Sequence, residues 1–186
     1  DNELKKMSDW SGDIGSFDIF GDQAVIAGKQ GTDFDEVWTI DLKTQKACCL
    51  SDFNRSFLQT RQVSKCEPLT IASHDWDVDG WVMKPADFDP EKTYPAILTI
   101  HGGPKGAYHG TFGVDMQTWA SAGYFVFFCN PIGSDGRGNK FAEIREKHGT
   151  VDYEDIMNFT DEVLKRYPQI DPQRMGVTGI SYGGYM

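Results

Sequence analysis

The feature that most constrains this chain is a Gly-x-Ser-x-Gly pattern at residues 179–183, which read Gly-Ile-Ser-Tyr-Gly. This pattern places a serine on a sharp turn between a strand and a helix, with glycines where a side chain would clash. Ser181 is therefore a candidate nucleophile. Such a serine needs a histidine to accept its proton and a carboxylate to orient that histidine. The pattern predicts a hydrolase.

The histidine and the carboxylate are expected in sequence beyond Met186, because both follow the serine in chains built on this turn. Without them we expect the 186 residues by themselves to be inactive. His101 precedes a pair of glycines, and the other histidines fall in predicted loops. None of the four is predicted to be the general base: His74, His101, His109 and His148.

The first part of the chain has the pattern of short strands separated by turns. Residues 24–28 and 37–42 are strand-like, and a turn leads into a third segment at 46–50. Several strands within about forty residues match the size of one propeller blade. A single blade leaves a face uncovered, so neighbouring blades are expected upstream of Asp1. A small independent sheet is the alternative.

After a polar connector at residues 54–67 the chain alternates between strands and helices. Apolar runs predict buried strands, and apolar residues at helical spacing predict amphipathic helices. The predicted strands are 69–73, 80–84, 94–100, 124–129 and 175–179, and the predicted helices are 114–122 and 151–167. Helical crossovers between the later strands predict an α/β fold with a doubly wound, largely parallel sheet. Ser181 follows its fifth strand.

A second motif, His-Gly-Gly-Pro at residues 101–104, follows the third predicted strand of this sheet. Acyl transfer builds negative charge on a carbonyl oxygen, which backbone N–H groups can stabilise. One donor is expected from the residue after the nucleophile, Tyr182, and the other from a glycine-rich loop. Gly103 is the preferred second donor, with Gly102 as the next choice.

Composition disfavours several classes of partner. The formal net charge of -10 argues against nucleic acid, because binding phosphates needs clustered Lys and Arg. No apolar run approaches the roughly 20 residues that cross a bilayer, so no membrane partner is predicted. The cysteines lack Cys-x-x-Cys spacing and histidines at zinc-ligand spacing; they are Cys48, Cys49, Cys66 and Cys129. We interpret them as reduced thiols, which favours a cytoplasmic location.

Two short patterns resemble ligand loops but are interpreted without a ligand. Asp75-x-Asp77-x-Asp79-Gly80 copies the first half of a calcium loop, but Ala86 stands where a bidentate Glu is needed. An acidic turn between two strands is the favoured interpretation. The run at residues 136–138 lacks the further glycine and Lys-Ser/Thr of a phosphate loop. No metal and no cofactor are predicted.

Together these motifs resemble the prolyl oligopeptidase family of serine peptidases, nearest to its acylaminoacyl-peptidase and dipeptidyl-peptidase-like branch. Besides the two motifs above, the resemblance runs through residues 79–85, 130–138 and 152–157. This family joins an α/β-hydrolase domain to a β-propeller that restricts access to small peptides. The resemblance therefore implies that residues 1–60 are the last blade of a propeller and that residues 61–186 are the N-terminal part of an α/β-hydrolase domain.

The resemblance also implies roles for individual residues. Ser181 would be the nucleophile, the backbones of Tyr182 and Gly103 would donate to the oxyanion, and short peptides would be the substrates. Near the substrate site it places His101, Gly102 and Arg137. One departure is Ile132, where many relatives have Arg. Two alternatives stay open, a carboxylesterase of the same fold and a non-catalytic scaffold, and a homo-oligomer is compatible with the sequence.

Overall fold

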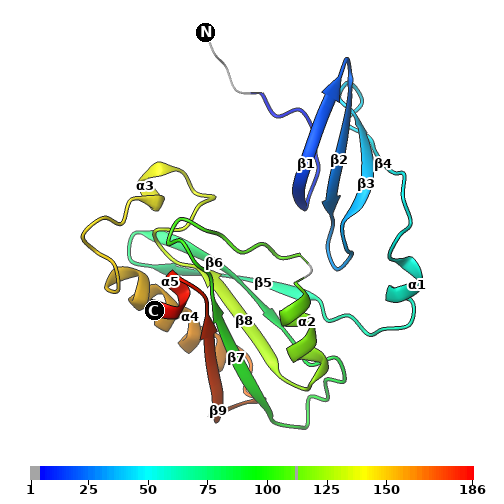
Figure 1. Cartoon of the computed structure of the whole chain (residues 1–186). Helices are drawn as coiled ribbons and strands as arrows, with labels where there is room; N and C mark the ends of the chain where they lie inside the picture. The colour runs from blue at the N-terminus through cyan, green and yellow to red at the C-terminus, as the bar shows by residue number, and fades with distance from the viewer. Residues whose placement is uncertain (1–4, 112) are drawn as a thin grey trace.

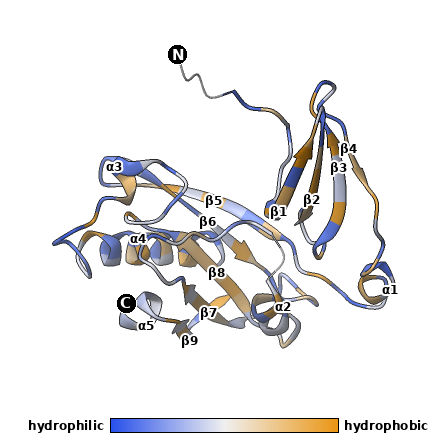
Figure 2. Ribbon diagram, turned by 45° about the horizontal axis from the view of Figure 1, so that its top comes forward, coloured by the Kyte–Doolittle hydropathy of each residue, from blue (hydrophilic) through white to orange (hydrophobic). Residues whose placement is uncertain are grey.

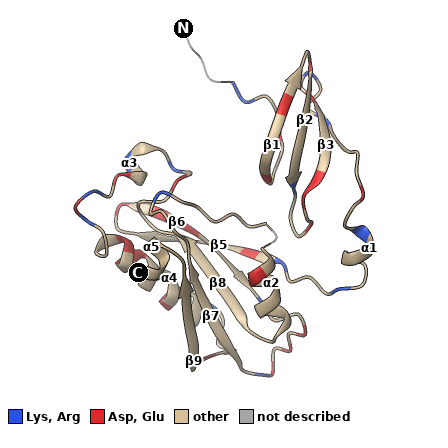
Figure 3. Ribbon diagram, in the orientation of Figure 1, with Lys and Arg blue, Asp and Glu red and all other residues tan. Residues whose placement is uncertain are grey.

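The chain folds into two separate sheets joined by a connector, as Figure 1 shows. The computed structural model describes residues 5–111 and 113–186, so residues 1–4 of the predicted blade lie outside the described residues. Acidic and basic residues of the described ranges are spread along the ribbon of both parts (Figure 3). Within the described ranges, no helix combines the length and the apolar character needed to span a bilayer.

The first sheet is antiparallel throughout and has the strand order β1-β2-β3-β4. Its strands are β1 (Asp13–Phe20), β2 (Gln23–Lys29), β3 (Glu36–Asp41) and β4 (Ala47–Cys49). The three strands predicted between residues 24 and 50 are therefore present, with each end shifted by one residue. An additional strand, β1, precedes them and lies at the edge of the sheet.

One face of this sheet is only partly covered. Phe17 pairs with Ile26 across β1 and β2, and paired residues share a face. Ile26 is buried in a small cluster with Ala24 and Ile40, whereas Phe17 is 68% exposed. A sheet with this composition buries its apolar face against another layer. The partly covered apolar face is compatible with a propeller blade packed against its neighbours. The blade itself stays a prediction.

The connector contains a one-turn helix, α1 (Arg55–Leu58), which its sequence does not predict. The carboxylate of Glu36 fixes the start of the connector by accepting hydrogen bonds from the Ser51 hydroxyl and from the backbone N–H of Asn54. A second link joins the first sheet to a loop of the other part, because the Thr111 hydroxyl, in the loop between β7 and α2, donates to the carboxylate of Asp13 on β1. The two parts thus touch through polar side chains.

The second sheet has the strand order β5-β6-β8-β7-β9. Its strands are β5 (Cys66–Ser73), β6 (Trp76–Met83), β7 (Tyr94–Ile100), β8 (Phe125–Asn130) and β9 (Ile170–Gly179). The pairs β5–β6 and β6–β8 are antiparallel, and β7–β8 and β7–β9 are parallel. The sheet is therefore mixed, and the prediction of a largely parallel sheet is wrong. A tight hairpin joins β5 to β6 and forces them antiparallel, whereas helical crossovers produce only the later, parallel pairs.

Helices cover both faces of this sheet. One face packs against α4 (Val151–Arg166) and the other against α2 (Val114–Ser121). Between them β8 is almost fully buried, as its continuous apolar run predicts, and it is orange over most of its length in Figure 2. The predicted helices are thus confirmed, and a one-turn helix, α3 (Asn139–Ala142), is additional.

The strands β6 and β9 are longer in the structure than the sequence predicts. The acidic turn is a tight one at His74 and Asp75, because β6 begins at Trp76 and carries Asp77 and Asp79 within it. Residues 170–174, which precede the predicted strand at 175–179, form the beginning of β9. The pairing with β7 jumps there from Ile170 to Met175, so a bulge absorbs the proline and polar residues between them.

Candidate active site

Ser181 lies at the tip of a turn between β9 and α5 (Tyr182–Tyr185). Its backbone has φ 58° and ψ −120°, which a residue with a Cβ rarely adopts. Such strain persists only where the surrounding structure holds it, and it is concentrated at functional sites. The turn therefore has the shape that the Gly-x-Ser-x-Gly pattern predicts.

The glycines around Ser181 are required by close backbone contacts. A Cβ on Gly179 would lie 2.2 Å from the carbonyl oxygen of Gly183. A Cβ on Gly183 would lie 2.1 Å from the carbonyl oxygen of Ile100 at the end of β7. Both distances are far below van der Waals contact. The two glycines thus let the turn close on itself and press against the neighbouring strand.

The glycine loop at residues 101–106 lies against the serine. Because β7 and β9 are parallel neighbours, their carboxyl ends meet at one edge of the sheet. A Cβ on Gly102 would lie 3.1 Å from the carbonyl oxygen of Ile180 and 3.4 Å from the Cβ of Ser181. Gly103 has φ +133°, which is a glycine conformation. The structure thus brings the two sequence motifs together.

His101 is half-buried and holds this loop rather than the serine. Its Nδ1 lies 2.8 Å from the carbonyl oxygen of Gly102, which can only accept, so Nδ1 carries a proton. In the neutral ring Nε2 then accepts from the Ser134 hydroxyl, 2.9 Å away. Burial lowers the pKa of His101, opposed by the hydrogen bond to Gly102. The neutral ring is therefore favoured, and both its nitrogens are occupied by neighbours.

The other histidines have partners away from the Ser181 hydroxyl. His74 Nε2 lies 3.1 Å from a carboxylate oxygen of Glu154, and His109 lies 3.8 Å from Asp13. The ring of His148 packs edge-on against the ring of Tyr182, with centroids 5.6 Å apart. Among the residues that the structure describes, these contacts place no imidazole as the base for Ser181.

The side chain of Tyr182 reaches a buried carboxylate on α4. Its hydroxyl donates a short hydrogen bond to Oδ2 of Asp152, a residue that is 1% exposed. Burial, followed by this hydrogen bond, raises the pKa of Tyr182. From the sequence, Asp152 is placed only in the predicted helix at residues 151–167 and in the family motif at residues 152–157. Neither its burial nor its contact with the turn has a local sequence signal, and the same holds for Ser134.

A pocket opens beside the loop and the turn. Its volume is about 320 Å³, and its walls include His101, Gly102, Tyr108, Gly179 and Ile180. Apolar side chains of α2, Met116 and Trp119, complete it. The edge of the sheet thus offers a concave surface next to the candidate nucleophile.

Arg137 lies outside that pocket and is bound to β6. Its Nε and Nη2 donate to the two carboxylate oxygens of Asp79 at 2.9 and 2.8 Å. Partial burial raises the pKa of Asp79, but hydrogen bonds from Arg137 and Thr70 outweigh it and leave this pKa below its ordinary value. The described part of the chain shows no group of three or more His, Cys, Asp or Glu able to hold a metal ion.

Known proteins resemble this chain in both sequence and fold. Residues 111–186 match the prolyl oligopeptidase family. An uncharacterized peptidase of Bacillus subtilis, YuxL, is 43% identical over 153 residues, which are 81% of this chain and 23% of that protein. A probable dipeptidyl-peptidase 5 of Aspergillus clavatus is 37% identical over 113 residues, 59% of this chain and 16% of that protein.

The fold comparison covers both sheets. An acylaminoacyl peptidase of Pyrococcus horikoshii has a TM-score of 0.89 at 33% identity, and the match spans 100% of this chain but 30% of that one. An acylaminoacyl peptidase solved with Z-Gly-Gly-Phe-chloromethyl ketone gives a TM-score of 0.91 at 34% identity, again over 100% of this chain and 30% of that one. The chain thus spans less than a third of these relatives. By sequence and by fold, the chain belongs to the prolyl oligopeptidase family.

Proposed function

We propose that the intact protein, meaning this chain with any sequence that adjoins it, is a serine peptidase that cleaves short peptides through an acyl-enzyme on Ser181. The observation that carries the proposal is the contact between two motifs far apart in sequence. Gly102 lies against Ser181, whose backbone has the strained geometry of a nucleophile turn. The named relatives that share this fold are acylaminoacyl and dipeptidyl peptidases, which supports a peptide substrate.

In the proposed reaction the Ser181 hydroxyl attacks the peptide carbonyl carbon. The hydroxyl proton passes to a histidine outside these residues, and the carbonyl electrons move onto the oxygen. The backbone N–H groups of Tyr182 and Gly103 donate to that oxyanion. The tetrahedral intermediate then expels the amine, which takes up the proton. Water, activated by the same histidine, attacks the acyl-enzyme and releases the acid.

Two further features of the intact protein belong to the same proposal. The half-covered face of the first sheet supports a propeller built from neighbouring blades. The four cysteines, none of them in a disulfide in the described residues, support a cytoplasmic location. A propeller over the catalytic edge would restrict the substrates to short peptides.

The test is labelling and turnover by the intact protein. A fluorophosphonate should react with the protein, and Ser181→Ala should abolish the label while reducing hydrolysis of aminoacyl and dipeptidyl nitroanilides by about 10⁶-fold. Faster turnover of simple p-nitrophenyl esters than of every peptide substrate would indicate a carboxylesterase. An unlabelled, folded protein would indicate a non-catalytic scaffold.

A further inference from the structure

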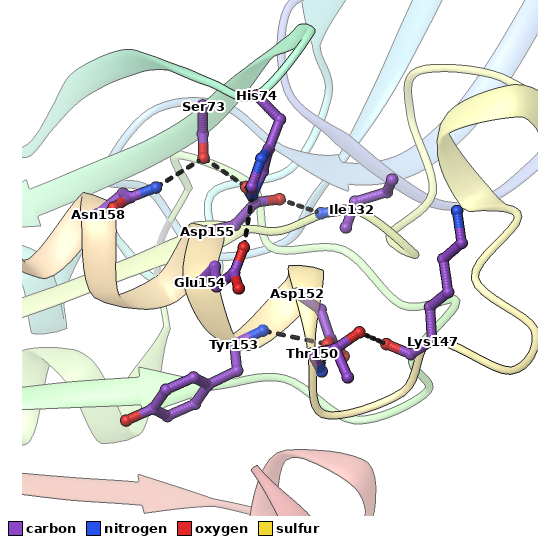
Figure 4. A network of polar contacts seen from close by, with 10 residues as sticks. All are labelled: Ser73, His74, Ile132, Lys147, Thr150, Asp152, Tyr153, Glu154, Asp155 and Asn158. Atoms are coloured by element: carbon purple, nitrogen blue, oxygen red, sulfur yellow. Dashed lines mark hydrogen bonds and ion pairs between the residues drawn. The ribbon is translucent and has the colours of Figure 1, made fainter.

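Asp152 is a buried carboxylate whose two oxygens serve different segments. Oδ1 accepts the backbone N–H groups of Thr150, at 2.9 Å, and Tyr153, at 3.0 Å, as Figure 4 shows at the start of α4. Oδ2 accepts the hydroxyl of Tyr182. Burying a carboxylate costs stability unless hydrogen bonds replace its water. Oδ1 therefore caps the N-terminal end of its own helix, and Oδ2 holds the turn that carries Ser181.

The position of Asp152 suits a fixed acceptor. It lies in the first turn of α4, where the helix dipole and free N–H groups favour a carboxylate. The pKa of Tyr182 is raised by burial and by Asp152, so the phenol keeps its proton and donates. The Tyr182 hydroxyl thus donates a directed hydrogen bond to a residue of a rigid 16-residue helix.

Tyr182 is the residue whose orientation matters most to the proposed chemistry. Its backbone N–H is the proposed oxyanion donor next to Ser181, which is itself held at φ 58°. The side chain contacts Asp152, the rings of His148 and Tyr185, and the backbone N–H of Gly149, which donates to the phenol oxygen. Two of these contacts are hydrogen bonds, and only in the one with Asp152 does the phenol donate to an acceptor that is fixed on a helix. It is therefore the contact that can set the angle of the residue.

We propose that Asp152 is a positioning residue for the oxyanion hole, acting through the Tyr182 hydroxyl to fix the direction of the Tyr182 backbone N–H. This inference rests on the serine peptidase function proposed above. A donor that binds the oxyanion acts on the transition state more than on bound substrate, so its misplacement lowers kcat and leaves KM nearly unchanged. Displacement by about 1 Å can cost up to about 10²-fold in rate.

The central variant is Tyr182→Phe in the intact protein, with Tyr153→Phe as the matched control. Both remove one phenol hydroxyl, but the Tyr153 side chain is 48% exposed on the outside of the same helix. We expect Tyr182→Phe to lower kcat by about 10- to 100-fold with KM within about twofold. Tyr153→Phe should match the unsubstituted protein. A Tyr182→Phe protein with full kcat would overturn the proposal.

Asp152 variants separate positioning from helix capping. In Asp152→Asn the amide oxygen can still cap α4 and the amide N–H can donate to the Tyr182 oxygen, so most of kcat should be retained. Asp152→Ala loses both functions, and kcat should fall as in Tyr182→Phe while the denaturation midpoint also falls. A purely structural role would lower the midpoint and leave kcat per folded molecule unchanged, which would contradict the inference.

The double variant gives the decisive comparison. If Asp152 acts through Tyr182, Asp152→Ala combined with Tyr182→Phe should lower kcat no further than Tyr182→Phe alone. Multiplying losses would show independent effects and overturn the inference. A failure of the function itself looks different, because the unsubstituted protein would then neither hydrolyse peptides nor react with a fluorophosphonate at Ser181.

Discussion

Two glycine-rich loops leave neighbouring parallel strands at the same edge of the second sheet, yet they stand in different relations to Ser181. The loop at residues 101–106 follows β7 and touches the serine through Gly102. The loop at residues 131–138 follows β8 and touches the first loop instead, through the hydrogen bond from the Ser134 hydroxyl to His101 and that from the Asp135 backbone N–H to the Gly106 carbonyl oxygen. Two loops of similar composition thus have different roles. The first contacts Ser181, and the second contacts and supports the first.

A second buried carboxylate, on α4, holds the loop at residues 131–138 in place. Asp155, on α4, accepts the backbone N–H of Ile132 at 2.9 Å and the hydroxyl of Ser73 at 2.5 Å (Figure 4). Burial raises the pKa of Asp155, and these hydrogen bonds act in the opposite direction. The Ile132 side chain is buried in a small cluster with Phe141 and Ile144. At this position, where many relatives are expected to carry Arg, the chain has a packing residue.

The largest expected difference between the loops comes from a matched pair of glycine substitutions. A Cβ on Gly103 would lie 2.4 Å from the backbone nitrogen of Lys105, so Gly103→Ala must reshape the first loop. We expect kcat/KM for peptide nitroanilides to fall by about 10²- to 10³-fold, the usual loss of one oxyanion donor. Gly136 also has positive φ, +103°, but no atom lies within 4 Å of its Cβ position.

Gly136→Ala is therefore the control for backbone strain. It should cost about 1 kcal/mol of unfolding free energy, measured by urea denaturation, and leave kcat/KM within about twofold. The contrast fails if Gly136→Ala reduces kcat/KM as strongly as Gly103→Ala. That result would give the second loop a direct role at the serine.

The sequence predicted the parts of the site that depend on backbone geometry. Gly103 and Gly179 sit where a Cβ would collide with backbone atoms two to four residues away, and this requirement acts at short range along the chain. The second sheet was also predictable in its strands, because long apolar runs such as that of β8 fit only a buried strand. The antiparallel pairing of β6 with β8 was not, since it depends on residues about fifty positions apart.

The side-chain contacts around the site could not be predicted, for a related physical reason. Asp152 lies in the first turn of α4 and Asp155 directly follows that turn, at a helix end where acidic residues are common for the helix dipole alone. Their burial arises only when the turn at Ser181 and the loop at Ile132 pack against that turn. The local sequence pattern does not predict such a contact.

The next prediction concerns the hydrogen bond from the Ser134 hydroxyl to His101, which joins the second loop to the first. Ser134→Ala removes the hydroxyl that donates to His101 Nε2 and leaves that buried nitrogen without its partner, which costs about 1–3 kcal/mol. Part of this cost can be relieved by movement of the first loop, so we expect kcat/KM to fall by about tenfold. Ser16→Ala, at an exposed position on β1, is the matched control and should have no effect. Unchanged kinetics in Ser134→Ala would show that the first loop holds its shape without this bond, with the backbone bond from Asp135 to Gly106 sufficient to join the two loops.

The smallest effect is expected at the far end of the second loop, where Arg137 pairs with Asp79. Both side chains are more than one-third exposed, so Arg137→Gln should cost less than about 1 kcal/mol of unfolding free energy, and less at high salt. The hydrogen bonds from Arg137 help to hold the pKa of Asp79 below its ordinary value, so this contribution is present above about pH 4 and is lost as Asp79 is protonated. Urea denaturation of the two proteins should therefore converge toward pH 3.

Kinetics of the same variant decide whether Arg137 belongs to the substrate site. As long as the guanidinium stays on Asp79, Arg137→Gln should change KM for dipeptidyl and acylaminoacyl substrates by less than about twofold. An increase in KM of tenfold or more would mean that Arg137 leaves Asp79 to bind substrate, as its place in the family motif implies. The supporting loop would then also contribute to binding, and the distinction between the two loops would hold only for the backbone.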